Sequence, residues 1–162
     1  TASARSLADR RVVVGQFGGL SSLSRQLVRA LRHRSATVVA SDEPDAAAQA
    51  AAANRFAATV FIGFEALPDQ PSTVHYYAVP QFESAGGRAL ASRLAAACTE
   101  TVDGFRPAVQ GMRLPVLRET RMPAVLVSIE EVQSVLDMSA EVVVAVVEAL
   151  EQWAADPLST SA

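Results

Sequence analysis

The chain has 162 residues, of which 50% are hydrophobic, so it is long enough to bury the core of one domain. Its net charge of −3 excludes the strongly basic surface of a typical nucleic-acid-binding protein. Its charged fraction of 19% excludes the highly charged, apolar-poor composition of a disordered chain. We therefore expect one folded domain and no nucleic-acid partner.

The first half of the chain alternates short apolar or β-branched runs with longer segments of helical spacing. The short runs predict strands at residues 12–14, 37–40 and 60–62. The longer segments predict helices at residues 20–31 and, after a cap at Ser41 or Asp42, as far as Ala57. Gly18 and Gly19 are expected to form the turn before the first helix, because that turn needs backbone conformations forbidden to other residues. The third strand is apolar throughout, which favours a central position with both faces covered.

The second half continues the alternation. We predict a strand at residues 74–79, a helix at 85–101, a buried strand at 123–127 and a last helix that starts near Ser139 and carries an apolar face to Trp153. Residues 103–122 contain two Gly and two Pro and predict an irregular crossing with one short strand near Val116 and Leu117. Together these elements predict a single α/β domain with a mixed, mostly parallel sheet of about five to six strands and helices on both faces.

The predicted domain occupies residues 11–155, between a flexible N-terminal segment at 1–10 and a flexible tail at 156–162. The chain begins at Thr1 without a methionine, so we expect it to be a fragment whose missing part could carry a leader, an anchor or another domain. No apolar run approaches the ~20 residues of a transmembrane helix. The lone Cys98 cannot form an internal disulfide and fits either side of a membrane, which leaves the cytoplasm and the cell envelope both open.

Several motifs in the chain occur together, and in this order, in one known family. They are VVVGQFGG at residues 12–19, ANRFAATVFIGFEA at 53–66, VHYY at 74–77, RALA at 88–91 and VLRETRMPAVLV at 116–127. Together they resemble the zinc-dependent N-acetylmuramoyl-L-alanine amidases of bacterial cell walls over residues 11–153. The resemblance implies the α/β fold of that family and peptidoglycan as the substrate class.

The resemblance also implies a chemistry. In the family, two His and one Glu hold a zinc ion that leaves one position open for water, and a second Glu acts as the base. The metal lowers the pKa of this water, and the resulting nucleophile attacks the amide between the lactyl group of muramic acid and L-alanine.

The positions that the family uses for this chemistry hold other residues here. The first ligand His falls on Phe17, the second on Glu65, and the catalytic Glu on Ser128. A family Gly that follows the catalytic Glu is replaced by Glu130. The loop that carries the ligand Glu has no counterpart, because Gly19 runs almost directly into the predicted helix. We therefore expect no bound metal, no cofactor and no catalytic residue, and we interpret the chain as a pseudoenzyme of the family.

Some of these residues have competing interpretations. Phe17, beside Phe64, is expected to fill the space that zinc leaves, since apolar packing replaces a costly array of buried polar ligands. Glu65 is either a binding residue or a solvent-facing strand end.

Other candidate residues have simple structural explanations. His33 and His75 are interpreted as surface or strand-packing residues, and Cys98 as a buried structural thiol. An arginine-rich helix face is interpreted as solvated; it carries Arg25, Arg29, Arg32 and Arg34. A cluster of carboxylates is interpreted as helix N-terminal charge rather than as a new acidic site; it consists of Glu130, Glu131 and Asp137.

The leading functional hypothesis is an inactive amidase-like domain with a binding or regulatory role in peptidoglycan metabolism. Its expected partner is either a peptidoglycan fragment or a protein of cell-wall synthesis. Degenerate amidase relatives that regulate peptidoglycan synthesis are known in actinobacteria, and the Arg-only, Ala-rich composition is compatible with such a source. One alternative is a residual hydrolase with a rearranged site that uses Glu65, Ser128 and Glu130–Glu131. Another is a structural module of a larger protein, which predicts a large exposed apolar patch.

Overall fold

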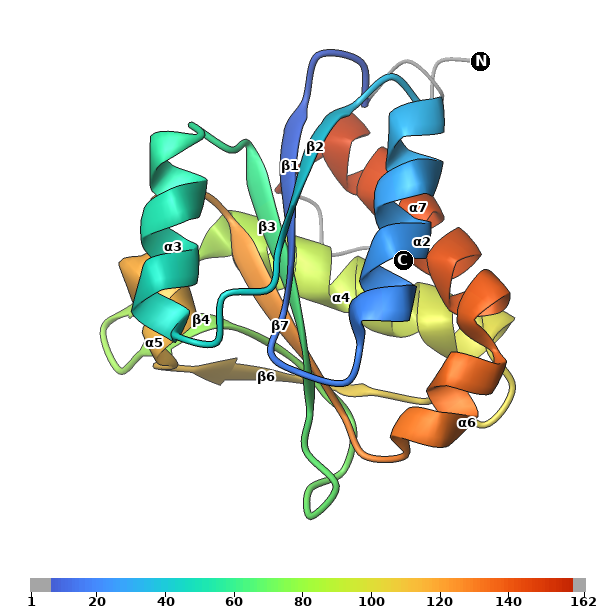
Figure 1. Ribbon diagram of the computed structural model, residues 1–162. Coiled ribbons are helices and arrows are strands. Elements are labelled where there is room, and N and C mark those ends of the chain that lie inside the picture. Colours follow the sequence, from blue (N-terminus) through green and yellow to red (C-terminus); the bar gives the residue numbers. More distant parts are fainter. Residues whose placement is uncertain (1–6, 159–162) are drawn as a thin grey trace.

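A seven-stranded sheet forms the centre of the computed structural model, in which residues 7–158 are described (Figure 1). The strands are β1 (Arg11–Gln16), β2 (Thr37–Ser41), β3 (Val60–Ala66), β4 (Thr73–Val79), β5 (Phe82–Glu83), β6 (Ala108–Met112) and β7 (Ala124–Ile129). The helices are α2 (Ser21–His33), α3 (Ala46–Arg55), α4 (Ala85–Thr101), α5 (Pro115–Glu119), α6 (Val132–Asp137) and α7 (Ser139–Ala155). The predicted α/β fold is confirmed.

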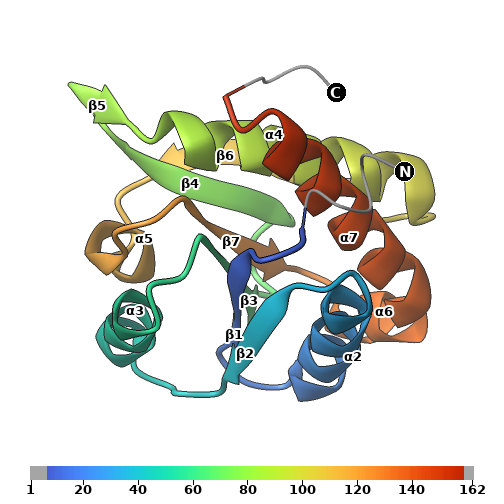
Figure 2. The same cartoon turned by 90° about the horizontal axis from the view of Figure 1, so that it is seen from above.

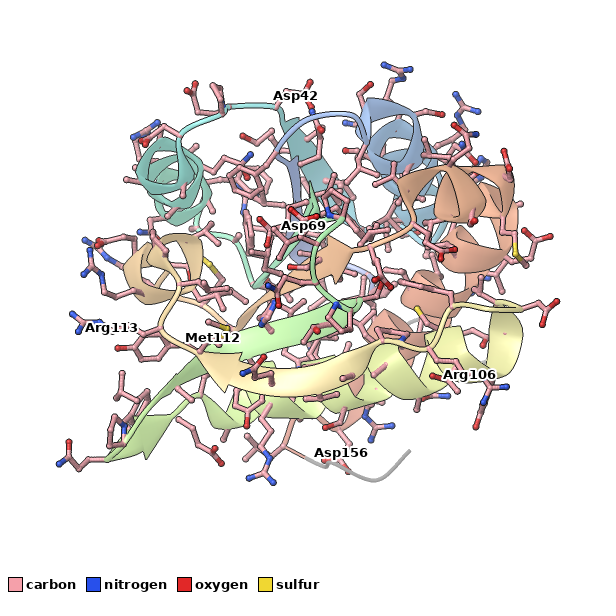
Figure 3. All side chains as sticks on the ribbon, turned by 90° about the horizontal axis from the view of Figure 1, so that it is seen from below. Asp42, Asp69, Arg106, Met112, Arg113 and Asp156 are labelled. Atoms are coloured by element: carbon pink, nitrogen blue, oxygen red, sulfur yellow. The ribbon has the colours of Figure 1, made fainter. Side chains whose placement is uncertain are left out.

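The strand order is β2-β1-β3-β7-β4-β5, with β6 pairing on β4. β1, β2, β3 and β7 are parallel, whereas β4 runs antiparallel to β7. The sheet is therefore mixed and mostly parallel, as predicted, and it contains two short strands, β5 and β6, that the sequence did not indicate. Figure 3 is seen from the end at which the parallel strands finish; there Asp42 and Asp69 follow β2 and β3.

Helices cover both faces of the sheet (Figure 2). α2, α4 and α7 pack on one face, and α3 and α5 lie together on the other. Each strand alternates its side chains between the two cores, so that Val12 and Val14 join the α2–α4–α7 core while Val13 joins the α3–α5 core. The central position predicted for the third strand is confirmed, because β3 lies between β1 and β7.

The crossing after α4 differs from the prediction. Residues 115–119 form the short helix α5 and not a strand, because Pro115 stands in its first turn and the N–H of Arg118 donates to the carbonyl of Leu114 at 2.8 Å. The strand of this crossing is β6, which pairs in parallel with β4. The glycine and proline content of the crossing favours irregular structure, so the sequence did not indicate this strand, which is only five residues long.

The cap of α3 also differs. Asp45, not Ser41 or Asp42, precedes the helix, and its Oδ2 accepts a hydrogen bond from the N–H of Ala48 at 2.9 Å. Ser41 instead ends β2, and Asp42 Oδ1 accepts a hydrogen bond from Gln16 at 2.9 Å.

α4 and α7 have the starts that the sequence predicts, at Ala85 and Ser139. They pack along each other, and the indole Nε1–H of Trp153 on α7 donates to the carbonyl of Gly86 on α4 at 3.1 Å. Cys98 is buried in α4, and burial raises the pKa of its thiol to about 12, so the thiol stays protonated and serves packing, as expected.

Most of the two predicted flexible segments, 1–10 and 156–162, lies outside the described residues. The described part differs from the prediction at its N-terminal end. Leu7 is buried in the core against the α2–α4–α7 side, and the guanidinium of Arg10 donates to the carbonyl of Ala154 at 3.3 Å. Within residues 7–158, no helix has the length and apolar character needed to cross a membrane.

Candidate functional site at the strand ends

The ends of three parallel strands and the start of β4 bring four residues into one row across the sheet. Glu65 of β3 pairs with Ser128 of β7, and Ser128 pairs with Thr73 of β4. On the other side of Glu65, the N–H of Phe17 donates to the carbonyl of Phe64 at 3.0 Å. We call Phe17, Glu65, Ser128 and Thr73 the strand-end row. It contains three of the four predicted site residues.

Two glycines lie two residues further into the sheet, and one of them, Gly15, allows α3 to approach closely. Gly15 and Gly63 pair with each other, and a Cβ on Gly15 would overlap the side chain of Gln49 from α3. Gln49 is fully buried, and its Nε2 donates to the carbonyls of Gln16 at 2.9 Å and Glu43 at 2.8 Å. These hydrogen bonds fix the end of β1, and with it the position of the strand-end row.

The turn after β1 is short. Gly18 and Gly19 have φ angles of 115° and 75°, which confirms that the turn requires glycine. Gln16 Oε1 accepts hydrogen bonds from the N–H of Gly18 at 2.7 Å and of Leu20 at 3.2 Å, and α2 begins at Ser21. The turn therefore passes from the strand to the helix with no room for a ligand-bearing loop.

A hydrogen bond inside the row joins two predicted site residues. The hydroxyl of Ser128 donates to Glu65 Oε2 at 2.6 Å, a short charge-assisted contact. Ser128 is 1% exposed, whereas Glu65 is half-buried. The serine proton is directed at a carboxylate, and the hydroxyl is shielded from a substrate, so this pair is suited to holding two strands together.

His75 lies in the next row of the same face, paired with Leu126 of β7. It is 6% exposed, and burial lowers the pKa of its imidazole, with the carboxylate of Glu65 acting in the opposite direction. Its Nδ1 has no hydrogen-bond partner among the described residues. The sequence indicated surface or strand packing for His75, and the structure buries it on β4. The sequence gave no sign that Glu65 lies near.

This burial predicts a dependence of stability on pH. In the unfolded chain His75 takes up a proton near its ordinary pKa of 6.5, whereas the folded protein keeps it neutral to lower pH. Since the unfolded state then binds more protons, the free energy of unfolding falls as the pH drops below that value. We expect a loss of about 1 kcal/mol between pH of about 7.5 and about 5.5, measured by urea denaturation.

The His75→Gln variant should lose most of this pH dependence. The matched control is His33→Gln, at an exposed histidine on α2, which should keep the wild-type difference. An equal pH dependence in wild type and His75→Gln would show that His75 is not the responsible group.

Phe17 lies beside Phe64, as the sequence indicates. The two residues are linked through the backbone, but their side chains lie on opposite faces of the sheet, because successive residues of a strand alternate. Phe17 packs, partly buried, against the α3–α5 core, and Phe64 belongs to the other core. If Phe17 fills former ligand space, it does so on the α3–α5 face of the sheet.

Glu130 lies outside the strand-end row. Its N–H donates to Ser72 Oγ at 2.9 Å, and the residue lines a separate cavity of about 670 Å³. Glu131 and Asp137 line the same cavity, so the carboxylates that the sequence grouped do lie near one another. Neither Glu65 nor Ser128 belongs to its lining.

The donors in the row do not fit a catalytic zinc site, which needs three strong ligands and an open position. Glu65 is the one carboxylate of the row, Phe17 has no donor atom, and the hydroxyl of Ser128 is already hydrogen-bonded to Glu65. Among residues 7–158, no group of three or more His, Cys, Asp or Glu side chains is placed to hold a metal ion.

Comparison with solved structures shows which known proteins have this fold. Ami1, an N-acetylmuramyl-L-alanine amidase from Mycobacterium smegmatis, matches with a TM-score of 0.71 and 15% identity over 92% of this chain and 98% of its own. The chain has the amidase fold. AmiC2, an N-acetylmuramoyl-L-alanine amidase of Nostoc punctiforme, matches with a TM-score of 0.70 and 17% identity over 90% of this chain and 98% of its own.

A third structure with the amidase fold is the CwlD amidase from Clostridioides difficile in complex with the GerS lipoprotein. It matches with a TM-score of 0.64 and 11% identity, over 88% of this chain and 97% of its own. No protein-family model matches the chain, and no curated protein sequence does. The amidase fold is thus shared by structure over about nine-tenths of the chain, while the sequence identity to these three amidases is 11–17%.

Proposed function

We propose that this chain is a catalytically inactive amidase-like domain with a binding or regulatory role in peptidoglycan metabolism. The amidase fold links it to enzymes that act on peptidoglycan. The observation that carries the proposal is the hydrogen bond from Ser128 to Glu65. It joins the positions at which the family resemblance places the catalytic Glu and a ligand His.

Amide hydrolysis by this family requires a polarised water and a base to accept its proton. In the strand-end row, Ser128 has no free basic atom directed at solvent, since it is buried and donates to Glu65. Phe17 supplies apolar surface in place of a ligand. Four positions correspond by the resemblance to the family's active-site pocket: Phe17, Glu65, Ser128 and Glu130. Of these, only Glu130 lines the cavity of about 670 Å³. These features together support the absence of catalysis.

The expected partner is a peptidoglycan fragment or a protein of cell-wall synthesis. CwlD, which shares the amidase fold, was solved bound to a lipoprotein, so an amidase fold can engage a protein partner. We assign the role to the domain at residues 11–155, with Leu7 packed onto it.

The direct test is a muropeptide digestion with and without added zinc, followed by mass spectrometry of the released peptides, with an active amidase as the positive control. We expect no cleavage of the amide to L-alanine under either condition. Zinc-dependent cleavage at a rate comparable to the control would contradict the proposal.

A sedimentation assay with purified peptidoglycan separates the two kinds of partner. If the ligand is peptidoglycan held at the strand-end row, Glu65→Gln should weaken co-sedimentation, whereas Arg55→Gln, at an exposed site on α3, should not. If the partner is a protein, the wild-type domain stays in the supernatant.

A further inference from the structure

A concave surface lies between α2 and β2, the strand at the open edge of the sheet, away from the strand-end row. It is a hollow of about 500 Å³ lined by Arg25, Val28, Arg29, Arg32, His33 and Ala40. The chain as a whole has a net charge of −3, yet this lining contains three guanidinium groups and no carboxylate. Such a local excess of one sign raises the concentration of the opposite ion at the surface.

The three arginines share one helix face, because they are spaced by four and then three residues on α2. Neither Arg25 nor Arg29 forms an ion pair with a described residue. Like charges at this spacing repel, and nothing in the lining compensates them. The next arginine, Arg34, is different, since both oxygens of Glu151 accept from it at 2.9 Å.

Arg32 is held at the rim of the hollow. Its Nη2 donates to the carbonyl of Val38 on β2 at 2.9 Å. The N–H of the preceding residue, Thr37, donates to the backbone carbonyl of Arg10 on the β1 side. Since the backbone groups of successive residues in a strand point in opposite directions, the carbonyl of Val38 points toward the open edge of the sheet. The guanidinium of Arg32 is thus held in place before a ligand binds, and its remaining N–H groups are available to that ligand.

We propose that this hollow binds a small soluble ligand that carries a diphosphate group. Guanidinium groups match phosphate oxygens in paired hydrogen bonds, which makes arginine clusters well suited to phosphate recognition. Seven residues of helix span about 10 Å, so that two linked phosphates reach these arginines better than one does. The volume lies within the range of small-ligand sites, and Val28 and Ala40 offer apolar contact to an uncharged part. This inference does not depend on whether the strand-end row is inactive.

The test is calorimetric titration of the purified chain with inorganic pyrophosphate, with orthophosphate and with sulfate. The double variant Arg25→Gln/Arg29→Gln removes two charges and keeps good helix formers. Arg55→Gln removes one charge from an exposed site on α3, on the other face of the sheet, and serves as the matched control. Each titration is repeated at low and high salt, because exposed ion pairs are screened.

We expect saturable pyrophosphate binding that is stronger than orthophosphate binding and weakens at high salt. The double variant should bind on the order of tenfold or more weakly, with an unchanged unfolding midpoint, while Arg55→Gln binds as wild type does. The proposal is overturned if pyrophosphate binding is not saturable, if all three anions bind alike, or if Arg55→Gln has the same effect as the double variant. Binding to vesicles with anionic headgroups without binding to pyrophosphate would equally overturn it, since it would indicate a membrane surface.

Discussion

The Trp153→Ala variant is expected to lose about 3–5 kcal/mol of unfolding free energy, measured by urea denaturation. Trp153 is 3% exposed and fills the contact between α7 and α4, and its indole donates to the carbonyl of Gly86. Truncation removes a large apolar group, opens a cavity and leaves that carbonyl without this donor. The contact between α7 and α4 is part of the core on the α2–α4–α7 side of the sheet.

Two further variants serve as controls for the Trp153→Ala measurement. Trp153→Phe keeps an aromatic ring but loses the hydrogen bond to Gly86, and it should cost about 1–2 kcal/mol. Val144→Ala lies on the exposed face of the same helix and should change the stability by about 0.5 kcal/mol or less. A Trp153→Ala protein as stable as Val144→Ala would mean that α7 does not pack on α4 as described.

The Ser128→Glu variant is expected to lose about 3 kcal/mol or more, although it restores the residue type of the family's catalytic base. Ser128 is 1% exposed and lies 2.6 Å from the carboxylate of Glu65. A second carboxylate there is both desolvated and repelled by the first. The measurement is the urea midpoint at neutral pH, and the variant should remain unable to cleave muropeptides.

Two further variants distinguish charge repulsion from a lack of space as the cause of the lost stability. In the double variant Glu65→Gln/Ser128→Glu, one of the two charges is gone, so part of the lost stability should return. Ser128→Ala, which removes only the hydroxyl, should cost about 1 kcal/mol. Wild-type stability in Ser128→Glu would show that the strand ends retain room for a catalytic carboxylate, and it would count against a repacked site.

Much of the fold follows from local signals in the sequence. The apolar run at Val60 to Ile62 and the 17 residues of α4 are long or regular enough to determine their own structure. The short elements depend on tertiary contacts. β6 owes its pairing to β4, and α5 owes its first turn to Pro115, which the sequence allows equally in an irregular crossing.

The candidate site was predicted in part. Strand ends of a parallel sheet meet at one edge, which is why Phe17, Glu65 and Ser128 lie together. The face of the sheet to which each side chain points was harder to predict from the sequence, because a shift of the strand register by one residue reverses it. The sequence placed Phe17 beside Phe64, but it did not indicate that their side chains lie on opposite faces. The proximity of His75 to Glu65 depends on the antiparallel register of β4 with β7, which leaves no local mark in the sequence.

The zinc content of the chain, purified without chelators and measured by elemental mass spectrometry, shows whether a metal centre forms at the strand ends. An active amidase of the same fold, purified in parallel, is the control. We expect much less than one zinc per chain, because the strand-end row provides a single carboxylate, two hydroxyls that are already hydrogen-bonded and a phenyl ring. One tightly held zinc per chain, lost in Glu65→Gln, would contradict this expectation and show that a metal centre forms at these strand ends.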